Sequence, residues 1–208
     1  MSRRSWKQWF LQQFGLAKKE SKRRPVRRAM AFETLGERIT PAVNAFFSGG
    51  VLSISGDNGN NTIEISRNLA GQILVNGGAI SIRGGNPTVA NAKLIQAFGN
   101  AGNDVINGGA GADTLYGAAG NDVFVFRAGE ANGDTVMDFA PGDTLRLEGY
   151  GVGATAQLGD HMLTIHYAGG DEIIHFYGAS PVATDWSFSS VSTLAPELAK
   201  VAADHFGF

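Results

Sequence analysis

The chain has no cysteine, few prolines and no long apolar segment among its 208 residues. Without cysteine it can form no disulfide and can offer no thiolate to a metal, so export to an oxidising space would require another stabiliser. Within residues 1–28 the longest apolar run, residues 9–11, is far shorter than the roughly 7 to 15 residues of a signal peptide's hydrophobic region. Nothing later approaches the roughly 20 apolar residues of a transmembrane helix. The sequence therefore predicts neither a standard signal peptide nor a membrane-spanning helix.

Common catalytic motifs are also missing. The chain contains no His-Glu-x-x-His zinc helix, no Gly-x-Ser-x-Gly elbow, no P-loop and no cysteine nucleophile. Its histidines do not have the spacing of a zinc site; they are His161, His166, His175 and His205. We therefore predict that the chain is not an enzyme.

Charge is divided unevenly along the sequence. Residues 1–40 carry eleven Lys or Arg against three Glu, whereas the remainder carries six Lys or Arg against sixteen Asp or Glu. A basic arm of this kind suits nucleic acid, an anionic membrane surface or a leader segment. Residues 1–28 also contain scattered aromatic side chains, which fits either a basic amphipathic helix on lipid or a disordered, solvated arm. The acidic body suits cation binding.

Glycine, in contrast, is abundant, at 29 residues or about twice its usual share. Three copies of a nine-residue unit follow one another at residues 99–107, 108–116 and 117–125. Each copy has Gly at positions one and four, Asp at position six and an apolar residue at position eight, which predicts a six-residue turn followed by a three-residue strand. Two copies then complete one circuit of a flattened coil, with the eighth residues pointing inward and the turns lying along two opposite edges.

Asp104 and Asp122 are eighteen residues apart, so this coil stacks them on one edge. Two stacked carboxylates repel each other unless a cation lies between them. The carbonyls of the turns supply further hard oxygen ligands, which are the ligands that calcium prefers. The spacing therefore predicts a calcium site.

Asp113 occupies the opposite edge of the coil. Its expected stacking neighbours, eighteen residues away in either direction, are Ile95 and Ala131. Neither supplies a carboxylate, so we expect a weaker half-site at Asp113, completed by carbonyls, water or the nearby Glu130.

The repeats resemble the Gly-Gly-x-Gly-x-Asp-x-apolar-x nonapeptide of RTX proteins, which folds as a calcium-bound parallel β-roll. The resemblance implies that one calcium ion is held by two carboxylates and four main-chain carbonyls, from Asp104, Asp122, Gly99, Ala101, Ala118 and Gly120. Position two departs from Gly at Asn100 and Ala118, which weakens the site and is tolerated only if the turn keeps its path. The alternative is an array of Asx turns in which the aspartates hydrogen-bond their own turns.

A second resemblance lies just before the expected ordered body. Residues 31–42 resemble the Leu-Glu-x-Arg-Leu-Thr-Pro-Ala leader motif that follows a basic arm on many exported bacterial surface proteins. The matching residues are Leu35, Glu37, Arg38, Thr40 and Pro41, and the departure is Gly36 before the Glu. This resemblance implies export, and Pro41 marks the expected start of the ordered body.

The flanking sequence predicts further β-structure. Before the repeats, short β-like runs are expected at residues 51–55, 62–66, 72–75, 79–82 and 94–95. A degenerate copy of the repeat begins at Gly56 and has Asn61 in place of the Asp, and its 43-residue offset from Gly99 is not a multiple of nine. We expect this copy to belong to a separate coil turn with no strong calcium site.

After the repeats, residues 123–147 resemble the segment that closes the β-roll in serralysin-type proteins. Asp134, Asp138 and Asp143 in this segment are candidates for extra calcium ligands or for turn caps. A final hairpin is expected around residues 168–171 and a last strand at 186–188, followed by a short amphipathic tail.

Together these patterns predict an all-β fold, a right-handed parallel β-roll or β-solenoid with β-rich caps on both sides and disordered or helical tails. The expected divisions are the arm, the N-terminal cap, the repeats, the closing region and the tail, at residues 1–42, 43–98, 99–125, 126–190 and 191–208. The predicted function is calcium binding in a secreted or cell-surface bacterial protein, with calcium stabilising the fold after export. A cell envelope or extracellular polymer stays open as a partner, and nucleic acid is not expected.

Two alternatives remain. One is a hydrolase acting on polysaccharide or peptide, with the β-roll as an appendage. The other is a binder of anionic surfaces that acts through the basic arm.

Overall fold

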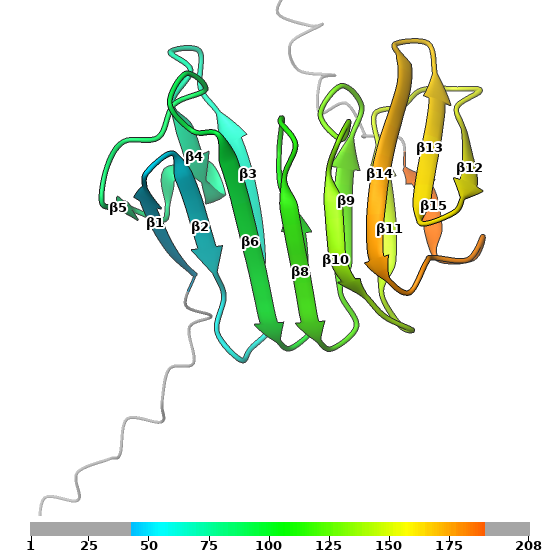
Figure 1. The fold of residues 1–208 in the computed structure, drawn as a ribbon, viewed down its shortest axis with the longest axis horizontal. Coiled ribbons are helices and arrows are strands. Elements are labelled where there is room, and N and C mark those ends of the chain that lie inside the picture. The colour runs from blue at the N-terminus through cyan, green and yellow to red at the C-terminus, as the bar shows by residue number, and fades with distance from the viewer. Residues whose placement is uncertain (1–42, 190–208) are drawn as a thin grey trace, which may run out of the picture. The chain divides into compact units, whose positions relative to one another are not determined.

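The computed structural model describes residues 43–189, which form fifteen β-strands and one short 3-10 helix, Asn76–Gly78 (Figure 1). The fold is all-β, as the sequence predicts. No helix within this range is long and apolar enough to cross a membrane. The basic arm and the C-terminal tail lie outside the described residues, and so do the expectations for them.

The strands form two sheets. Sheet A has nine strands in the order β12-β13-β14-β10-β8-β6-β2-β1-β5. They are β1 (Asn44–Ser48), β2 (Val51–Ser55), β5 (Ile82–Arg83), β6 (Leu94–Ala101), β8 (Thr114–Ala119), β10 (Thr135–Phe139), β12 (Thr155–Gly159), β13 (Met162–Tyr167) and β14 (Gly170–Gly178). Sheet B has six strands in the order β15-β11-β9-β7-β3-β4. They are β3 (Thr62–Arg67), β4 (Ile73–Val75), β7 (Val105–Asn107), β9 (Val123–Arg127), β11 (Thr144–Glu148) and β15 (Trp186–Ser189).

The chain passes from sheet A to sheet B and back in successive circuits. Strand β2 leads to β3, β6 to β7, β8 to β9 and β10 to β11, and the equivalent strands of neighbouring circuits pair in parallel. Gln96 pairs with Thr114 and Val105 with Val123, so a circuit within the repeats contains eighteen residues. This is the parallel β-roll that the repeats predict.

Circuits outside the repeats are longer. Thr114 pairs with Thr135, which makes the next circuit twenty-one residues long, and Thr62 pairs with Val105, forty-three residues further on. The extra residues of the forty-three-residue circuit form β4, the 3-10 helix and β5, between β3 and β6. The degenerate repeat copy therefore lies directly beside the first full repeat, because the offset of forty-three reflects an excursion of the chain and not a displaced turn.

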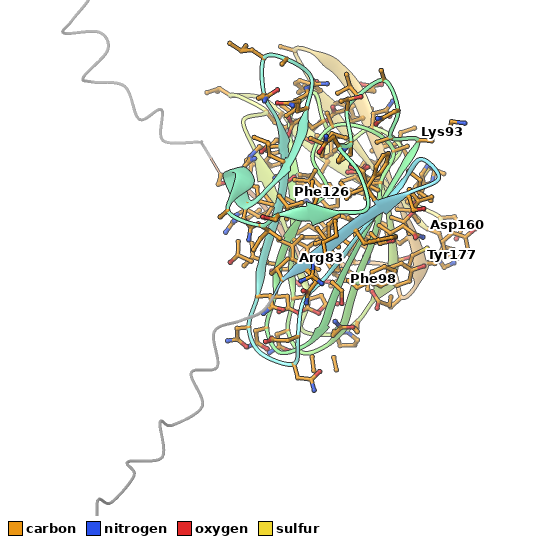
Figure 2. All side chains as sticks on the ribbon, turned by 90° about the vertical axis from the view of Figure 1, so that its left-hand side faces the viewer. Arg83, Lys93, Phe98, Phe126, Asp160 and Tyr177 are labelled. Atoms are coloured by element: carbon orange, nitrogen blue, oxygen red, sulfur yellow. The ribbon has the colours of Figure 1, made fainter. Side chains whose placement is uncertain are left out.

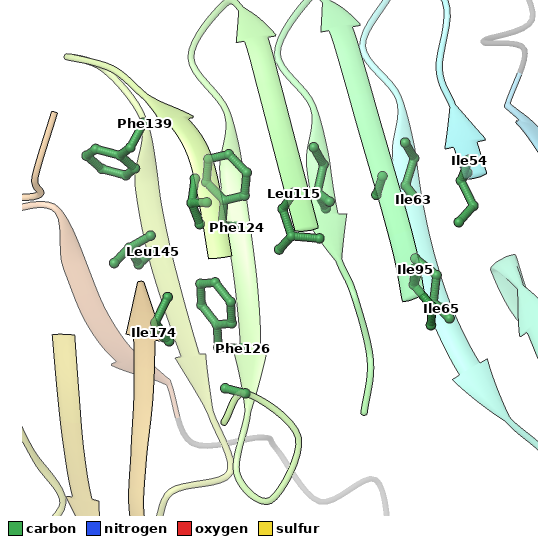
Figure 3. Close-up of a cluster of buried hydrophobic side chains, with 14 of the residues drawn as sticks. Ile54, Ile63, Ile65, Ile95, Leu115, Phe124, Phe126, Phe139, Leu145 and Ile174 are labelled. Carbon is green, nitrogen blue, oxygen red and sulfur yellow. The ribbon is translucent and has the colours of Figure 1, made fainter. Parts of the chain in front are cut away.

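The core lies between the two sheets. Ile63, Phe124 and Leu145 from sheet B face Ile54 and Leu115 from sheet A, and all five are at most 1% exposed (Figure 3). Full burial of an aliphatic or aromatic side chain of this size contributes roughly 1.5–3 kcal/mol. The eighth residue of every repeat is fully buried, as the pattern predicts.

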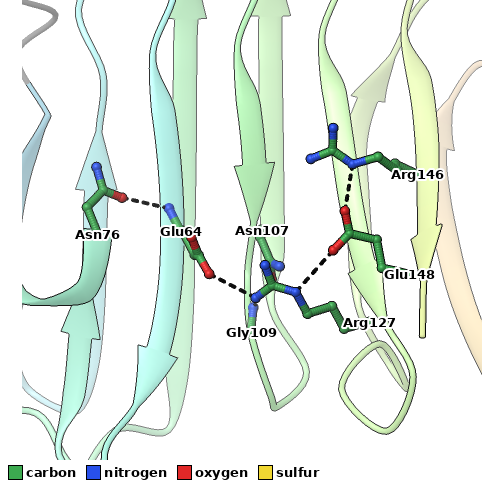
Figure 4. Close-up of polar contacts among 7 residues, drawn as sticks. All are labelled: Glu64, Asn76, Asn107, Gly109, Arg127, Arg146 and Glu148. Atoms are coloured by element: carbon green, nitrogen blue, oxygen red, sulfur yellow. Dashed lines mark hydrogen bonds and ion pairs between the residues drawn. The ribbon is translucent and has the colours of Figure 1, made fainter. Parts of the chain in front are cut away.

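The outer surface of sheet B carries a chain of charged side chains. Arg127 lies 2.9 Å from Glu64 and 3.3 Å from Glu148, and Arg146 lies 2.8 Å from Glu148 (Figure 4). These four residues come from β3, β9 and β11, and because β7 lies between β3 and β9 the ion pairs span four neighbouring strands of sheet B. The charged side chains are half-buried or exposed, so each pair contributes modestly, and together they cover this face.

Some flanking strands differ from the sequence expectation. Strands β1 and β12 are additional. The β-like run at residues 79–82 is not one strand, because Ile80 makes only an isolated bridge to Val75 and Ile82 begins β5. Local apolar alternation does not specify such edge pairings, because their partners are set by the fold.

Candidate metal centre

Four turns stack along one edge of the roll, which is the lower edge in Figure 1. They span residues 56–61, 99–104, 117–122 and 140–143, and each connects a strand of sheet A to a strand of sheet B. The upper edge carries the loops of residues 108–113 and 128–134. The repeats therefore place their aspartates on two opposite edges, as the sequence predicts.

A ladder of hydrogen bonds joins the sixth residues of the lower turns. The donors are main-chain N–H groups. That of Asn61 donates to Asp104 Oδ1 at 2.7 Å, that of Asp104 to Asp122 Oδ1 at 2.8 Å, and that of Asp122 to Asp143 Oδ1 at 2.8 Å. Each carboxylate therefore has one oxygen fixed by the main chain of the preceding circuit. This arrangement brings Asp104 and Asp122 together on one edge.

The second oxygen of these carboxylates has no partner. Asp104 and Asp122 are fully buried, and Oδ2 of each lacks any hydrogen bond to the described residues. Burial raises the pKa of Asp104, and it raises the pKa of Asp122 to about 6 because charge is desolvated there and further carboxylates lie close by. A buried, unpartnered carboxylate oxygen is costly, and a bound cation would relieve that cost.

The first residue of the two turns within the repeats, Gly99 or Gly117, must be glycine to accommodate this oxygen. A Cβ atom on Gly99 would overlap Asp104 Oδ2, and one on Gly117 would overlap Asp122 Oδ2. The free oxygen thus lies directly over the first residue of its own turn. The carbonyl that approaches the same Cβ position of Gly99 is that of Gly117 in the next circuit, whereas the Gly99 carbonyl, an expected ligand, lies beside the Cβ position of Gly56 in the preceding circuit.

The turns also stack in backbone contact. A Cβ atom on Gly120 would overlap the Gly102 carbonyl of the preceding circuit, and Gly120 has a φ of 145°, so position four admits no side chain. At position two Asn100 and Ala118 have φ of 79° and 67°, close to the 80° of Gly109 in the second repeat. The departures from Gly therefore keep the path of the turn, although Ala118 bears a conformational cost of roughly 1–2 kcal/mol.

Asparagines form a second ladder beside the first. The main-chain N–H of Asn103 donates to the side-chain Oδ1 of Asn60 at 2.8 Å, and the main-chain N–H of Asn121 donates to the side-chain Oδ1 of Asn103 at 3.0 Å. This ladder was not predicted from the sequence, although Asn precedes the sixth residue in the degenerate copy and in two full repeats. It fixes the register of neighbouring turns without any metal.

On the upper edge the partner of Asp113 differs from the expectation. The sequence predicts Ala131, but the circuit here contains twenty-one residues, and the Asp113 amide donates to Asp134 Oδ1 at 2.9 Å. Ile95 does lie level with Asp113 on the other side, because Gln96 pairs with Thr114. Asp113 therefore has the carboxylate of Asp134 as its stacking neighbour, which corrects the expectation that neither stacking neighbour supplies one.

The upper pair is buried and close to other acidic groups. Asp113 and Asp134 are at most 2% exposed, and Asp113 Oδ2 lacks a hydrogen bond to any described residue. Burial, with Glu130 nearby, raises the pKa of Asp113 to about 7. Burial, with Asp113 as the strongest charged neighbour, raises the pKa of Asp134 to about 9. The upper edge thus holds a second group of buried carboxylates without a positively charged partner among the described residues.

Asp138 and Asp143 have protein donors. Asp138 accepts hydrogen bonds from the amides of Gly117 and Ala118, both at 2.9 Å. Asp143 Oδ2 accepts from the Ala140 amide at 2.9 Å, while its Oδ1 belongs to the lower ladder. Both residues therefore cap turns, which was the alternative to a ligand role.

No group of three or more His, Asp or Glu side chains within residues 43–189 is arranged to hold a metal ion. A cation at either edge would therefore need main-chain carbonyls in addition to the carboxylates. This donor set consists of hard oxygens and fits calcium, whose coordination requires roughly six to eight of them.

Residues 97–130 match the family described as the RTX calcium-binding nonapeptide repeat (4 copies). The chain thus contains RTX repeats, which bind Ca²⁺, and the resemblance of residues 99–125 to the RTX nonapeptide is confirmed. The repeat family is non-catalytic.

One similar solved structure is an extracellular lipase, LipA from Serratia marcescens, with 17% identity and a TM-score of 0.33. The match covers 66% of this chain and 21% of the lipase chain. A comparison with curated proteins gives no match.

Proposed function

We propose that this chain is a secreted or cell-surface module whose β-roll becomes stable when calcium binds at its turns. The observation that carries the proposal is the pair of fully buried, unpartnered Oδ2 atoms of Asp104 and Asp122. At neutral pH and without a cation, two buried negative charges oppose the stacking that the hydrogen-bond ladder enforces. The free energy of folding therefore depends on a cation between these turns.

The site on the lower edge uses the residues that the sequence suggests. The carboxylates of Asp104 and Asp122 would bind the ion, with the carbonyls of Gly99, Ala101, Ala118 and Gly120 completing the oxygen shell. Calcium would neutralise the two carboxylates and connect two successive circuits of the roll. Asp113 with Asp134 would form a second site on the upper edge.

The coupling between calcium and folding suits a protein that is exported. If calcium outside the cell is about ten to twenty times the dissociation constant of a site, each site stabilises the fold by roughly 1.4–1.8 kcal/mol. The same roll would be less stable in a low-calcium cytosol. The leader-like motif at residues 31–42 supports this order of events, because it resembles a motif of exported proteins.

The test is a far-UV circular dichroism titration of the full chain with calcium, starting in chelator and using magnesium as the control. We expect a calcium-specific gain of β signal at sub-millimolar to millimolar concentration. Asp104→Asn and Asp122→Asn keep the shape of the side chain and remove its charge, so each should shift the calcium midpoint at least about tenfold, equivalent to about 1.4 kcal/mol.

A matched control is Asp160→Asn, because Asp160 is an exposed aspartate in the β12–β13 turn, away from both edge ladders. It should leave the midpoint unchanged. Full β signal in chelator that is unaffected by calcium, or equal responses to calcium and magnesium, would contradict the proposal.

A further inference from the structure

The outer surface of sheet A differs from that of sheet B. On β2, β6, β8, β10 and the adjoining part of β14, the outward residues alternate with the buried ones. They are Val51, Ser53, Ser55, Leu94, Gln96, Phe98, Thr114, Tyr116, Thr135, Met137, Ile173, His175 and Tyr177. None of these residues is Asp, Glu, Lys or Arg, and Asp138, which is also half-buried on β10, accepts hydrogen bonds from the main-chain amides of Gly117 and Ala118. The outer surface of sheet B, in contrast, carries two arginines and two glutamates in ion pairs.

Aromatic side chains form a row across this face. Phe98 and Tyr116, on neighbouring strands, stack with ring centroids 4.6 Å apart and an interplanar angle of 14°. Met137 follows on β10 and Tyr177 on β14. Tyr177 is 63% exposed, and Figure 2 shows it on the same side of the molecule as Phe98. Phe98 and Tyr116 are half-buried, so Tyr177 is the exposed ring of the row.

Polar side chains run beside the aromatic row. Each polar residue precedes a member of the aromatic row by two residues on the same strand. They pair across the strands in the order Gln96, Thr114, Thr135 and His175. They supply an amide, two hydroxyls and an imidazole. Each group can donate and accept hydrogen bonds without carrying a fixed charge.

A cavity of about 530 Å³ opens where these two rows reach β14. Thr135, His175 and Tyr177 line it from the sheet, and Asp160 and His161 line it from the turn between β12 and β13. His161 has a φ of 52°, a left-handed conformation that suits the two-residue turn between β12 and β13. The cavity thus combines one exposed aromatic ring with several hydrogen-bonding groups.

We propose that this face binds a neutral polysaccharide chain, with one sugar ring in the cavity beside Tyr177. The apolar C–H face of a sugar packs on an aromatic ring, while its hydroxyls need donors and acceptors of the kind that Thr135, His161 and His175 supply. Asp160 adds a carboxylate that accepts from sugar hydroxyls and repels an anionic chain. The row from Phe98 to Tyr177 crosses four strands, about 15 Å, which is the length of a short oligosaccharide.

Charge decides between a glycan and other extended partners. Nucleic acid, anionic lipid and acidic polysaccharide are bound through Lys and Arg, which the outward positions of these strands lack. A second copy of the chain is the remaining competitor, because flat sheet faces also self-associate. The polar row favours the glycan, since a protein interface of this kind is more apolar at its centre.

The test is affinity electrophoresis of the full chain in calcium, through native gels that contain hydroxyethyl cellulose, dextran or alginate. We expect retardation in at least one neutral gel and none in alginate. Tyr177→Ala and His175→Ala should each weaken that binding at least about tenfold. Leu69→Ala, which removes a fully exposed apolar side chain from the β3–β4 connection, should not affect it.

The opposite results would overturn the proposal. They are equal retardation of the wild type and both cavity variants, no retardation in either neutral gel, or stronger binding to alginate. Concentration-dependent dimers that Tyr177→Ala abolishes, without glycan binding, would assign the face to self-association. Because all variants keep the calcium-binding turns, an unchanged calcium titration separates failure of this proposal from failure of the calcium-dependent fold.

Discussion

At the scale of single residues, glycine and aspartate of one turn depend on each other. Position one must be glycine because the free carboxylate oxygen of position six occupies the space of a Cβ atom. The motif therefore records a steric requirement as well as a conformational one. This relation explains why Gly56 remains glycine in the degenerate copy, where a Cβ atom would overlap Asn61 Oδ1.

Asn61 shows what the turn does without a cation. Its Oδ1 accepts from the Asp57 amide at 2.7 Å, and its Nδ2 donates to Asp57 Oδ1 at 3.0 Å. The same position in the next two turns of this edge has a carboxylate oxygen without a donor. The side-chain amide of Asn61 has hydrogen-bond partners for both of its polar atoms, whereas the carboxylates of Asp104 and Asp122 each have one oxygen without a partner. The first turn of the edge therefore needs no metal.

The dependence between positions one and six predicts the effect of Gly117→Ala. The added methyl group displaces Asp122 Oδ2, so the variant should lose about 1–3 kcal/mol of stability and also bind calcium more weakly. Thermal unfolding in chelator and in calcium measures both effects. Gly153→Ala is the control, because Gly153 has a φ of 88° with no atom near its Cβ position, and it should lose stability without a change in calcium midpoint.

At the scale of elements, the two edges should respond to pH in chelator. Burial raises the pKa values of Asp122, Asp113 and Asp134 to about 6, 7 and 9, against about 4 in an unfolded chain. Between about pH 4 and pH 9 the folded state binds more protons than the unfolded state, so the free energy of unfolding falls as pH rises. Below pH 4 both states are protonated and the dependence disappears.

We therefore expect a higher melting temperature in chelator at pH 5 than at pH 8. In calcium this trend should weaken or reverse, because calcium binds the deprotonated carboxylates. Asp134→Asn removes the most strongly shifted group and should flatten the profile in chelator. A melting temperature in chelator that rises with pH would show that these carboxylates are already neutralised by protein groups.

The sequence predicts elements where the period is regular and fails where it changes. Three tandem copies specify the eighteen-residue circuit, and with it the core positions and the pairing of Asp104 with Asp122. The circuit lengthens to twenty-one residues after the repeats, which replaces Ala131 by Asp134 as the neighbour of Asp113. No local signal reports that change, because the extra residues lie in loops whose length the strand pattern does not constrain.

At the scale of the whole molecule, the roll is quasi-one-dimensional, so each circuit is stabilised mainly by its neighbours. Unpartnered carboxylate oxygens occur in the middle circuits, within the repeats. The C-terminal end of sheet A is different, because β12, β13 and β14 pair antiparallel and bury Leu163, Ile165 and Ile174 completely. These side chains belong to the same continuous core as the repeats, but the antiparallel pairing of β12, β13 and β14 is local and does not pass through the edge turns.

Calcium should therefore protect the molecule unevenly. We expect amide hydrogen exchange in residues 99–125 to slow by at least about tenfold per bound ion when calcium replaces chelator, as a gain of about 1.4 kcal/mol requires. Residues 155–178 should change much less, because their pairing partners and core persist in chelator. Mass spectrometry of peptides from the full chain measures both regions in one experiment. Uniform protection along the chain would mean instead that the roll unfolds as one unit, so that calcium at one edge controls every circuit.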